Sequence, residues 1–71
     1  GTIEERMEAI FQRGLMGREP HQLSPREKRQ IVHELRRDGV FDLKGKVSQV
    51  ARRLEVSEKT VYRYLKAEDK I

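Results

Sequence analysis

The 71-residue sequence predicts an all-α fold, a small helical domain of about four helices. Apolar residues recur at helical spacings in several short stretches that are separated by polar breaks. Only 35% of the residues are apolar and 39% are charged, and the Lys, Arg, Glu and Gln side chains lose little rotamer freedom in helices. Because a chain of this length can bury only a small core, we expect no more than one domain.

The positive charge is concentrated in the C-terminal two thirds of the chain. The formal net charge is +4, with three Arg against four Glu up to Leu23 and thirteen Lys or Arg against eight acidic residues after it. This asymmetry favours an anionic partner for the second part. The chain has no cysteine, which excludes disulfides and Cys-based zinc sites and is compatible with a reducing cytosol.

Neither a membrane span nor a signal peptide is predicted. No apolar run approaches the roughly 20 residues that cross a bilayer, and no signal-peptide pattern is present. We therefore expect a soluble, cytoplasmic protein without a membrane partner. The chain starts with Gly-Thr rather than Met, so we expect the natural protein to be longer.

The first predicted helix runs from about Thr2 to Arg13 and ends at Gly14. Its apolar side chains share one stripe, formed by Ile3, Met7, Ile10 and Phe11. A three-turn helix is marginal alone, so this stripe must be covered. Packing on its own domain and dimerisation through Ile3, Met7 and Ile10 are equally consistent with the pattern.

Residues 14–23 are predicted to be a connector because they contain two glycines and a proline. Leu15 and Met16 are candidates to anchor it on the core. Arg18 suggests a minor-groove arm, but Glu19 beside it opposes contact with phosphate, and a plain connector is the better interpretation. We accordingly divide the chain into 1–23, a helix and connector that serve dimerisation or link to an upstream domain, and 24–71, the DNA-binding part.

Ser24-Pro25-Arg26-Glu27 predicts a helix start. Ser24 suits the N-cap, Pro25 the first helical position, and Glu27 completes a capping box. The buried face is predicted to be Ile31, Val32 and Leu35, and Asp38-Gly39 is predicted to end the helix. In the next loop, Phe41 is expected to plug the core and Gly45 to permit a sharp change of direction.

The stretch from Val47 to Leu65 predicts two short helices joined by a tight turn, a helix-turn-helix. Small Ala51 lies where the two helices would cross, and Ser57 precedes the second apolar run as its N-cap. Apolar residues are expected to face inward at Val47, Val50, Leu54, Val56, Val61 and Leu65. The plain alternative is a helical hairpin whose pattern means only a core, but the small residue, capped turn and basic second helix favour DNA binding.

The second helix of the pair is predicted to read DNA bases in the major groove. Arg63 shares a face with Lys59 and Thr60, and an arginine there can contact guanine through O6 and N7. The predicted base contacts are Ser57, Lys59, Thr60, Tyr62 and Arg63. Flanking residues at helix ends more naturally meet phosphates, and these are Lys46, Ser48, Gln49 and Lys66.

Other chemistry is poorly supported by the sequence. There is no cysteine nucleophile, phosphate-binding glycine loop or acidic cluster, so we predict no catalysis, no cofactor and no metal. His33 is expected to be a surface or half-buried helix residue. Tyr62 and Tyr64 point about 200° apart on one helix, so they do not form a stacking platform, and Tyr64 is expected in the core. A protein-interaction module remains the alternative of a different class.

The region from about Leu23 to Lys66 resembles the C-terminal DNA-binding domain of YheO-like bacterial transcriptional regulators, in which a PAS-like sensor domain precedes the helix-turn-helix. The matching features are Glu27-Lys28, Ile31-Val32, Gly39-Val40-Phe41, Leu43-Lys44-Gly45, Val47, Val50-Ala51, Leu54, Val56-Ser57 and Thr60 to Leu65. The resemblance implies a transcription factor that binds double-stranded DNA, with Ser57, Lys59, Thr60, Tyr62 and Arg63 on its recognition helix.

The sequence departs from this family at two positions. Glu55 stands in the turn where Gly or Asn is usual, and a left-handed backbone there costs about 1 kcal/mol. Lys46 stands where a small residue is expected.

The last segment also resembles Hin-type recombinases, so the DNA-binding domain of a recombinase or transposase is the second interpretation. A homodimer is expected because one recognition helix reads only a few base pairs.

Overall fold

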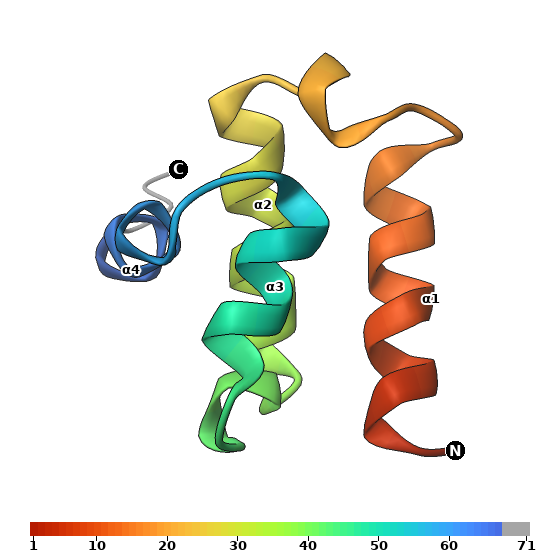
Figure 1. The fold of residues 1–71 in the computed structure, drawn as a ribbon. Helices are drawn as coiled ribbons and strands as arrows, with labels where there is room; N and C mark the ends of the chain where they lie inside the picture. Colours follow the sequence, from red (N-terminus) through yellow and green to blue (C-terminus); the bar gives the residue numbers. More distant parts are fainter. Residues whose placement is uncertain (68–71) are drawn as a thin grey trace.

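A computed structural model describes residues 1–67 of the chain. Over these residues it has four α-helices, α1 (Ile3–Leu15), α2 (Pro25–Arg37), α3 (Lys46–Leu54) and α4 (Glu58–Lys66), and two short 3₁₀ turns, η1 (Pro20–Gln22) and η2 (Val40–Asp42). Figure 1 shows α2 and α3 in the middle, with α1 on one side and α4 on the other. The predicted all-α class with four helices is confirmed. From the sequence, the residues after Lys66 have little to bury and are expected to fray; of these, residues 68–71 lie outside the described residues.

The first helix is longer than predicted, and Gly14 does not end it. Thr2 caps α1 in a capping box with Glu5, and the helix continues to Leu15, after which Met16 and Gly17 both have positive φ, 53° and 78°. A Cβ atom at Gly14 would lie 2.4 Å from Ile31 Cγ1. Glycine is therefore needed here because α1 and α2 approach closely, and not because the chain turns.

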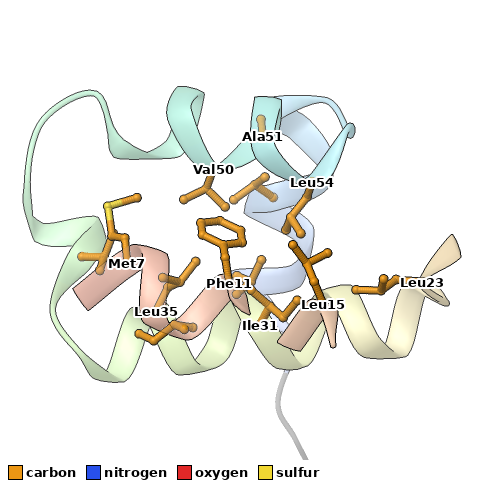
Figure 2. Packing of buried hydrophobic residues seen from close by; sticks show 13 residues of the cluster. Met7, Phe11, Leu15, Leu23, Ile31, Leu35, Val50, Ala51 and Leu54 are labelled. Atoms are coloured by element: carbon orange, nitrogen blue, oxygen red, sulfur yellow. The ribbon is translucent and has the colours of Figure 1, made fainter. Parts of the chain in front are cut away.

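The apolar stripe of α1 is covered by its own domain. Met7 and Ile10 are only 2% and 4% exposed, and Phe11 is fully buried. In Figure 2 the Phe11 ring lies below Val50 and Leu54 of α3. The alternative of a dimer contact through Ile3, Met7 and Ile10 is therefore wrong for this stripe, because two of its three members are already buried within the chain.

One hydrophobic core joins both parts of the chain, so residues 1–23 and residues 24–67 pack as a single unit. Within the described residues its buried members are Met7, Ile10, Phe11, Leu15, Leu23, Ile31, Val32, Leu35, Val40, Val50, Ala51, Leu54 and Val61. The functional division at residue 23 stays a prediction. Of the two expected anchors in the connector, Leu15 is buried and Met16 is exposed.

The second helix begins and ends where the sequence predicted. Ser24 accepts from the backbone N–H of Glu27, whose side chain accepts from the backbone N–H of Ser24. Asp38 is the C-cap, and Gly39 comes next with φ 83°. The prediction for Phe41 is wrong in detail: Val40 is fully buried, whereas Phe41 is half-buried against the core. The 3₁₀ turn η2 points Val40, not its larger neighbour, into the space between α2 and α3.

The last two helices form the predicted helix-turn-helix. Gly45, with φ 83°, precedes α3, and Ala51 is buried where α3 and α4 pack. Glu55 adopts the left-handed conformation with φ 59°, and the turn is closed by a bond from Val56 N to Ala51 O of 3.0 Å. Ser57 then caps α4 by accepting from Thr60 N at 3.1 Å. The left-handed backbone expected at Glu55 in the turn is thus confirmed.

Candidate nucleic-acid interface

The outer face of α4 carries an aromatic ring and three cations. Lys59, Tyr62, Arg63 and Lys66 are all exposed, Tyr62 by 52%, while Val61 on the opposite side is fully buried. Their spacing places them on one side of the helix. In Figure 1 this helix lies at the edge of the molecule away from α1. The described part of α4 thus presents a convex basic surface of the width of one helix.

Two other predicted base-contact residues have partners within the protein. The Ser57 hydroxyl accepts the Thr60 backbone N–H and lies 3.0 Å from the Thr60 hydroxyl. Ser57 is exposed, and Thr60 is half-buried. Both residues lie at the front of α4 as predicted, but their hydroxyls first serve to cap the helix. Lys59, Tyr62 and Arg63 therefore remain the side chains most free to reach a base.

The C-terminal end of α4 is held by two side chains of α2. His33 Nε2 lies 2.7 Å from the carbonyl oxygen of Tyr64, and Arg36 Nη1 donates to the carbonyl oxygen of Leu65 at 3.0 Å. Because a carbonyl can only accept, Nε2 of His33 carries the proton. Terminal carbonyls that lack helical partners are satisfied in this way. These contacts tie the C-terminal end of α4 to α2.

Sequence patterns predict these residues only in part. His33 was expected to be a surface or half-buried helix residue, and it is half-buried. Tyr64 was expected in the core, and it packs against the core partly buried. The spacing of three residues between His33 and Arg36 puts both on one face of α2, but only the tertiary arrangement shows that α4 ends against that face.

Away from α4, several basic side chains pair with carboxylates. The pairs are Arg6 with Asp38, Arg13 with Glu34, Arg18 with Glu27, Lys46 with Glu4, and Arg53 with Glu8. Within residues 1–67, by contrast, the structure gives no ion pair to Lys59, Arg63 or Lys66. The outer face of α4 therefore carries three cations that no carboxylate of residues 1–67 neutralises.

The predicted phosphate contacts fall into two groups. Lys66 is exposed on α4, but Lys46, Ser48 and Gln49 are half-buried in the first turns of α3. Lys46 pairs with Glu4 of α1, and Gln49 Nε2 donates to the same carboxylate at 2.9 Å. The Lys46 ammonium and the Gln49 amide together hold the pKa of Glu4 below its ordinary value.

A second contact between α1 and α3 was not predicted from the sequence. Arg53 donates from both terminal nitrogens to Glu8, at 2.6 and 3.2 Å, and its guanidinium carbon lies 4.3 Å from the centroid of the Phe11 ring. The bidentate geometry and the ring stacking are both typical of arginine. The Arg53 guanidinium, followed by the Gln12 amide, lowers the pKa of Glu8.

Arg18 has a structural position that accounts for it without DNA. Its Nε donates to the carbonyl oxygen of Leu15 at 3.0 Å, and its Nη1 pairs with Glu27 at 2.9 Å. It therefore ties the end of α1 to the start of α2. The backbone N–H of Ser24 and then the Arg18 guanidinium lower the pKa of Glu27. The minor-groove arm considered for Arg18 finds no support in this arrangement.

Within the described residues there is no cluster of three or more His, Cys, Asp or Glu that could hold a metal ion. Among those same residues, no helix combines the length and apolar character that crossing a bilayer requires.

Comparison with known proteins places this geometry in a family. A family model described as an HTH domain matches residues 2–66. YheO of Escherichia coli (strain K12), named as an uncharacterized protein, is 48% identical over 40 residues, which are 56% of this chain and 17% of YheO. An uncharacterized protein of Haemophilus influenzae is 45% identical over 40 residues, 56% of this chain and 18% of that relative.

These relatives are much longer than the matched segment, since the match spans less than a fifth of their length. No solved structure matches. The family match runs from the cap of α1 to the end of α4, and so includes the first helix as well as the helix-turn-helix. The chain therefore belongs to the HTH-domain family and is similar to the helix-turn-helix domain of YheO-like proteins.

Proposed function

We propose that this chain binds double-stranded DNA sequence-specifically by inserting α4 into the major groove. One observation carries the proposal: α4 exposes Lys59, Arg63 and Lys66 on one face without an ion pair from any residue in 1–67. Lys46 and Arg53 of the preceding helix, by contrast, are paired with carboxylates of α1. Exposed cations clustered on the second helix of a helix-turn-helix suit contact with phosphates and base edges.

The four outward side chains of α4 have different proposed roles. Arg63 is the candidate for bidentate contact with a guanine, and Lys59 lies near the start of the helix, where recognition helices meet base edges. The Tyr62 ring offers an apolar contact to a thymine methyl group and a hydroxyl for hydrogen bonding. Lys66, at the far end, is the candidate for phosphate. Ser57 and Thr60 would contribute only the hydrogen-bonding positions of their hydroxyls that the contacts between the two residues leave free.

We further propose that the domain serves a bacterial transcription regulator that acts in the cytoplasm as a homodimer. The resemblance to YheO-like regulators supports the regulatory role, and the few base pairs that one helix reads support a second copy on a half-site about one helical turn away. Since Met7 and Ile10 are buried, the second copy must be held by other surfaces.

Selection of binding sites from a random duplex library, followed by titration at several salt concentrations, tests the proposal. A DNA-binding domain should select a consensus sequence, and its affinity should fall steeply with salt as counterions are released. If no duplex is enriched, or the affinity is independent of salt, the basic surface of α4 does not bind DNA and a protein-interaction role takes its place.

A further inference from the structure

The first turn of α3 binds a carboxylate that comes from another helix. Lys46 Nζ pairs with one oxygen of Glu4, Gln49 Nε2 donates to the other at 2.9 Å, and Lys46 Nζ also donates to Gln49 Oε1 at 3.1 Å. The Lys46 side chain is only 14% exposed, whereas that of Glu4 is 57% exposed. Two well-positioned donors therefore converge on an anionic group that is itself open to solvent.

The docking geometry of a helix-turn-helix brings the DNA backbone to this helix. When the second helix of the motif lies in the major groove, the first crosses the backbone. With α4 as the second helix, α3 is the first. A phosphate offers its oxygens to an ammonium and an amide much as a carboxylate does. A DNA phosphate at the start of α3 and Glu4 would therefore compete for the same two donors, and the two anions would repel each other.

We propose that Lys46 and Gln49 form a phosphate-binding site that Glu4 occupies in the free protein, and that a DNA phosphate displaces Glu4 on binding. The proposal rests on the proposed function of α4. Displacement needs only a rotation of the Glu4 side chain, because α1 itself stays anchored through Met7 and Phe11 in the core and through Glu8 to Arg53.

Glu4 then lowers the affinity for every duplex rather than for particular sequences. Phosphate contacts fix the position of a protein on DNA without reading bases, so an occupant of a phosphate site weakens specific and nonspecific complexes alike. This separates the role of Glu4 from that of Arg63, the proposed base reader on α4, whose removal should change the ratio of the affinities for the selected and the random duplex.

A double-mutant cycle of Glu4→Gln and Lys46→Met, measured by Kd for the selected duplex and a random duplex, tests the competition. In the wild-type background, Lys46→Met should change Kd by less than about threefold, because Lys46 exchanges one anion for another. In the Glu4→Gln background it should weaken binding about tenfold, the effect of losing one charge-assisted hydrogen bond. Glu4→Gln alone should strengthen binding to both duplexes.

Glu34→Gln is the matched control, since it removes the same charge from a pair with Arg13 between α1 and α2. The competition is overturned if Glu4→Gln strengthens binding no more than Glu34→Gln does, or if Lys46→Met has the same effect in both backgrounds. If wild-type protein binds no duplex at all, the proposed function fails, and this site fails with it.

A measurement on the unmodified protein covers the case in which a variant does not fold. The carbon-13 chemical shift of the Glu4 carboxyl group should move on addition of duplex toward that of a solvent-exposed glutamate, while the Glu8 signal should stay unchanged. A Glu4 signal that does not move under saturating duplex overturns the proposal without any substitution.

Discussion

The two sides of this domain use charge in opposite ways. On the α1 side, Glu4 and Glu8 reach across to Lys46 and Arg53 of α3, segments more than forty residues apart in the chain. On the α4 side, Lys59, Arg63 and Lys66 project without an ion pair from the described residues. Net charge alone therefore does not locate a binding surface, because paired cations hold the fold together and unpaired ones remain available to a ligand.

The largest expected effect is on the α1 side and concerns stability. Phe11→Ala should lower the free energy of unfolding by about 3 to 5 kcal/mol, because it empties the centre of the core and removes the ring beneath Arg53. Chemical denaturation measures this change. Tyr62→Ala on the exposed face of α4 is the control and should change stability by about 0.5 kcal/mol or less. Equal losses for both would mean that α4 is not an outward surface.

The second-largest expected effect is a loss of stability at the contact between the two helices of the motif. Ala51→Leu should destabilise the fold by about 1 to 3 kcal/mol, since Ala51 is 4% exposed and a larger side chain forces α3 and α4 apart. Thermal unfolding checks this. Arg52→Leu, at the exposed neighbouring position, should leave the melting temperature nearly unchanged, and a similar drop for both would contradict the packing described for Ala51.

Substitutions on the α4 side should affect DNA binding and leave stability unchanged. Arg63→Ala should weaken binding to the selected site by about 1 to 3 kcal/mol and relax the preference at one base position. Lys66→Ala should weaken selected and random duplexes together and reduce the salt slope by about one. Titrations with both duplexes separate the two effects. A wild-type ratio of affinities in Arg63→Ala would show that Arg63 does not read a base.

The smallest expected effect is a dependence of stability on acid. The pKa values of Glu4, Glu8 and Glu27 are lower in the folded state than in the unfolded chain. Their stabilising contributions are therefore complete above the unfolded pKa and are lost as pH falls through the folded one.

The melting temperature should accordingly decrease between about pH 5 and about pH 3, where glutamates titrate. Glu8→Gln should make that decrease shallower, because it removes the group held by Arg53. Glu58→Gln, at the exposed start of α4, is the control, since the described residues give Glu58 no ion pair. An identical acid profile for wild type and Glu8→Gln would show that the pair with Arg53 does not stabilise the fold.

Local signals in the sequence were sufficient for most of the fold. The capping box of Ser24 and Glu27, the stop at Gly39 and the turn at Glu55 depend on neighbouring residues, and each lies where it was predicted. The prediction that Gly14 ends the first helix is wrong. A glycine near the end of an amphipathic stretch gives the same local sequence pattern whether it ends the helix or allows a second helix to pack closely against it. Only the position of Ile31 distinguishes the two.

The part of the candidate site that lies on a single helix could be predicted from the sequence. Periodicity alone puts Lys59, Tyr62 and Arg63 on the outer face of α4, and all three side chains are exposed there. The occupation of Lys46 and Gln49 by Glu4 could not be predicted, because it joins residues more than forty positions apart through a tertiary contact. The burial of Val40 in place of Phe41 has a similar reason, since a loop without periodicity does not reveal which side chain points inward.

DNA is proposed to meet the unpaired cations of α4 and not the paired ones between α1 and α2. Backbone amide chemical shifts of the wild-type domain, recorded during titration with its selected duplex, test this most directly. We expect the largest changes within residues 57–66 and at the start of α3, with the α1 residues that pack against α2 unaffected. Largest changes along α1 and α2, around Arg13 and Glu34, with α4 unaffected, would contradict the proposal.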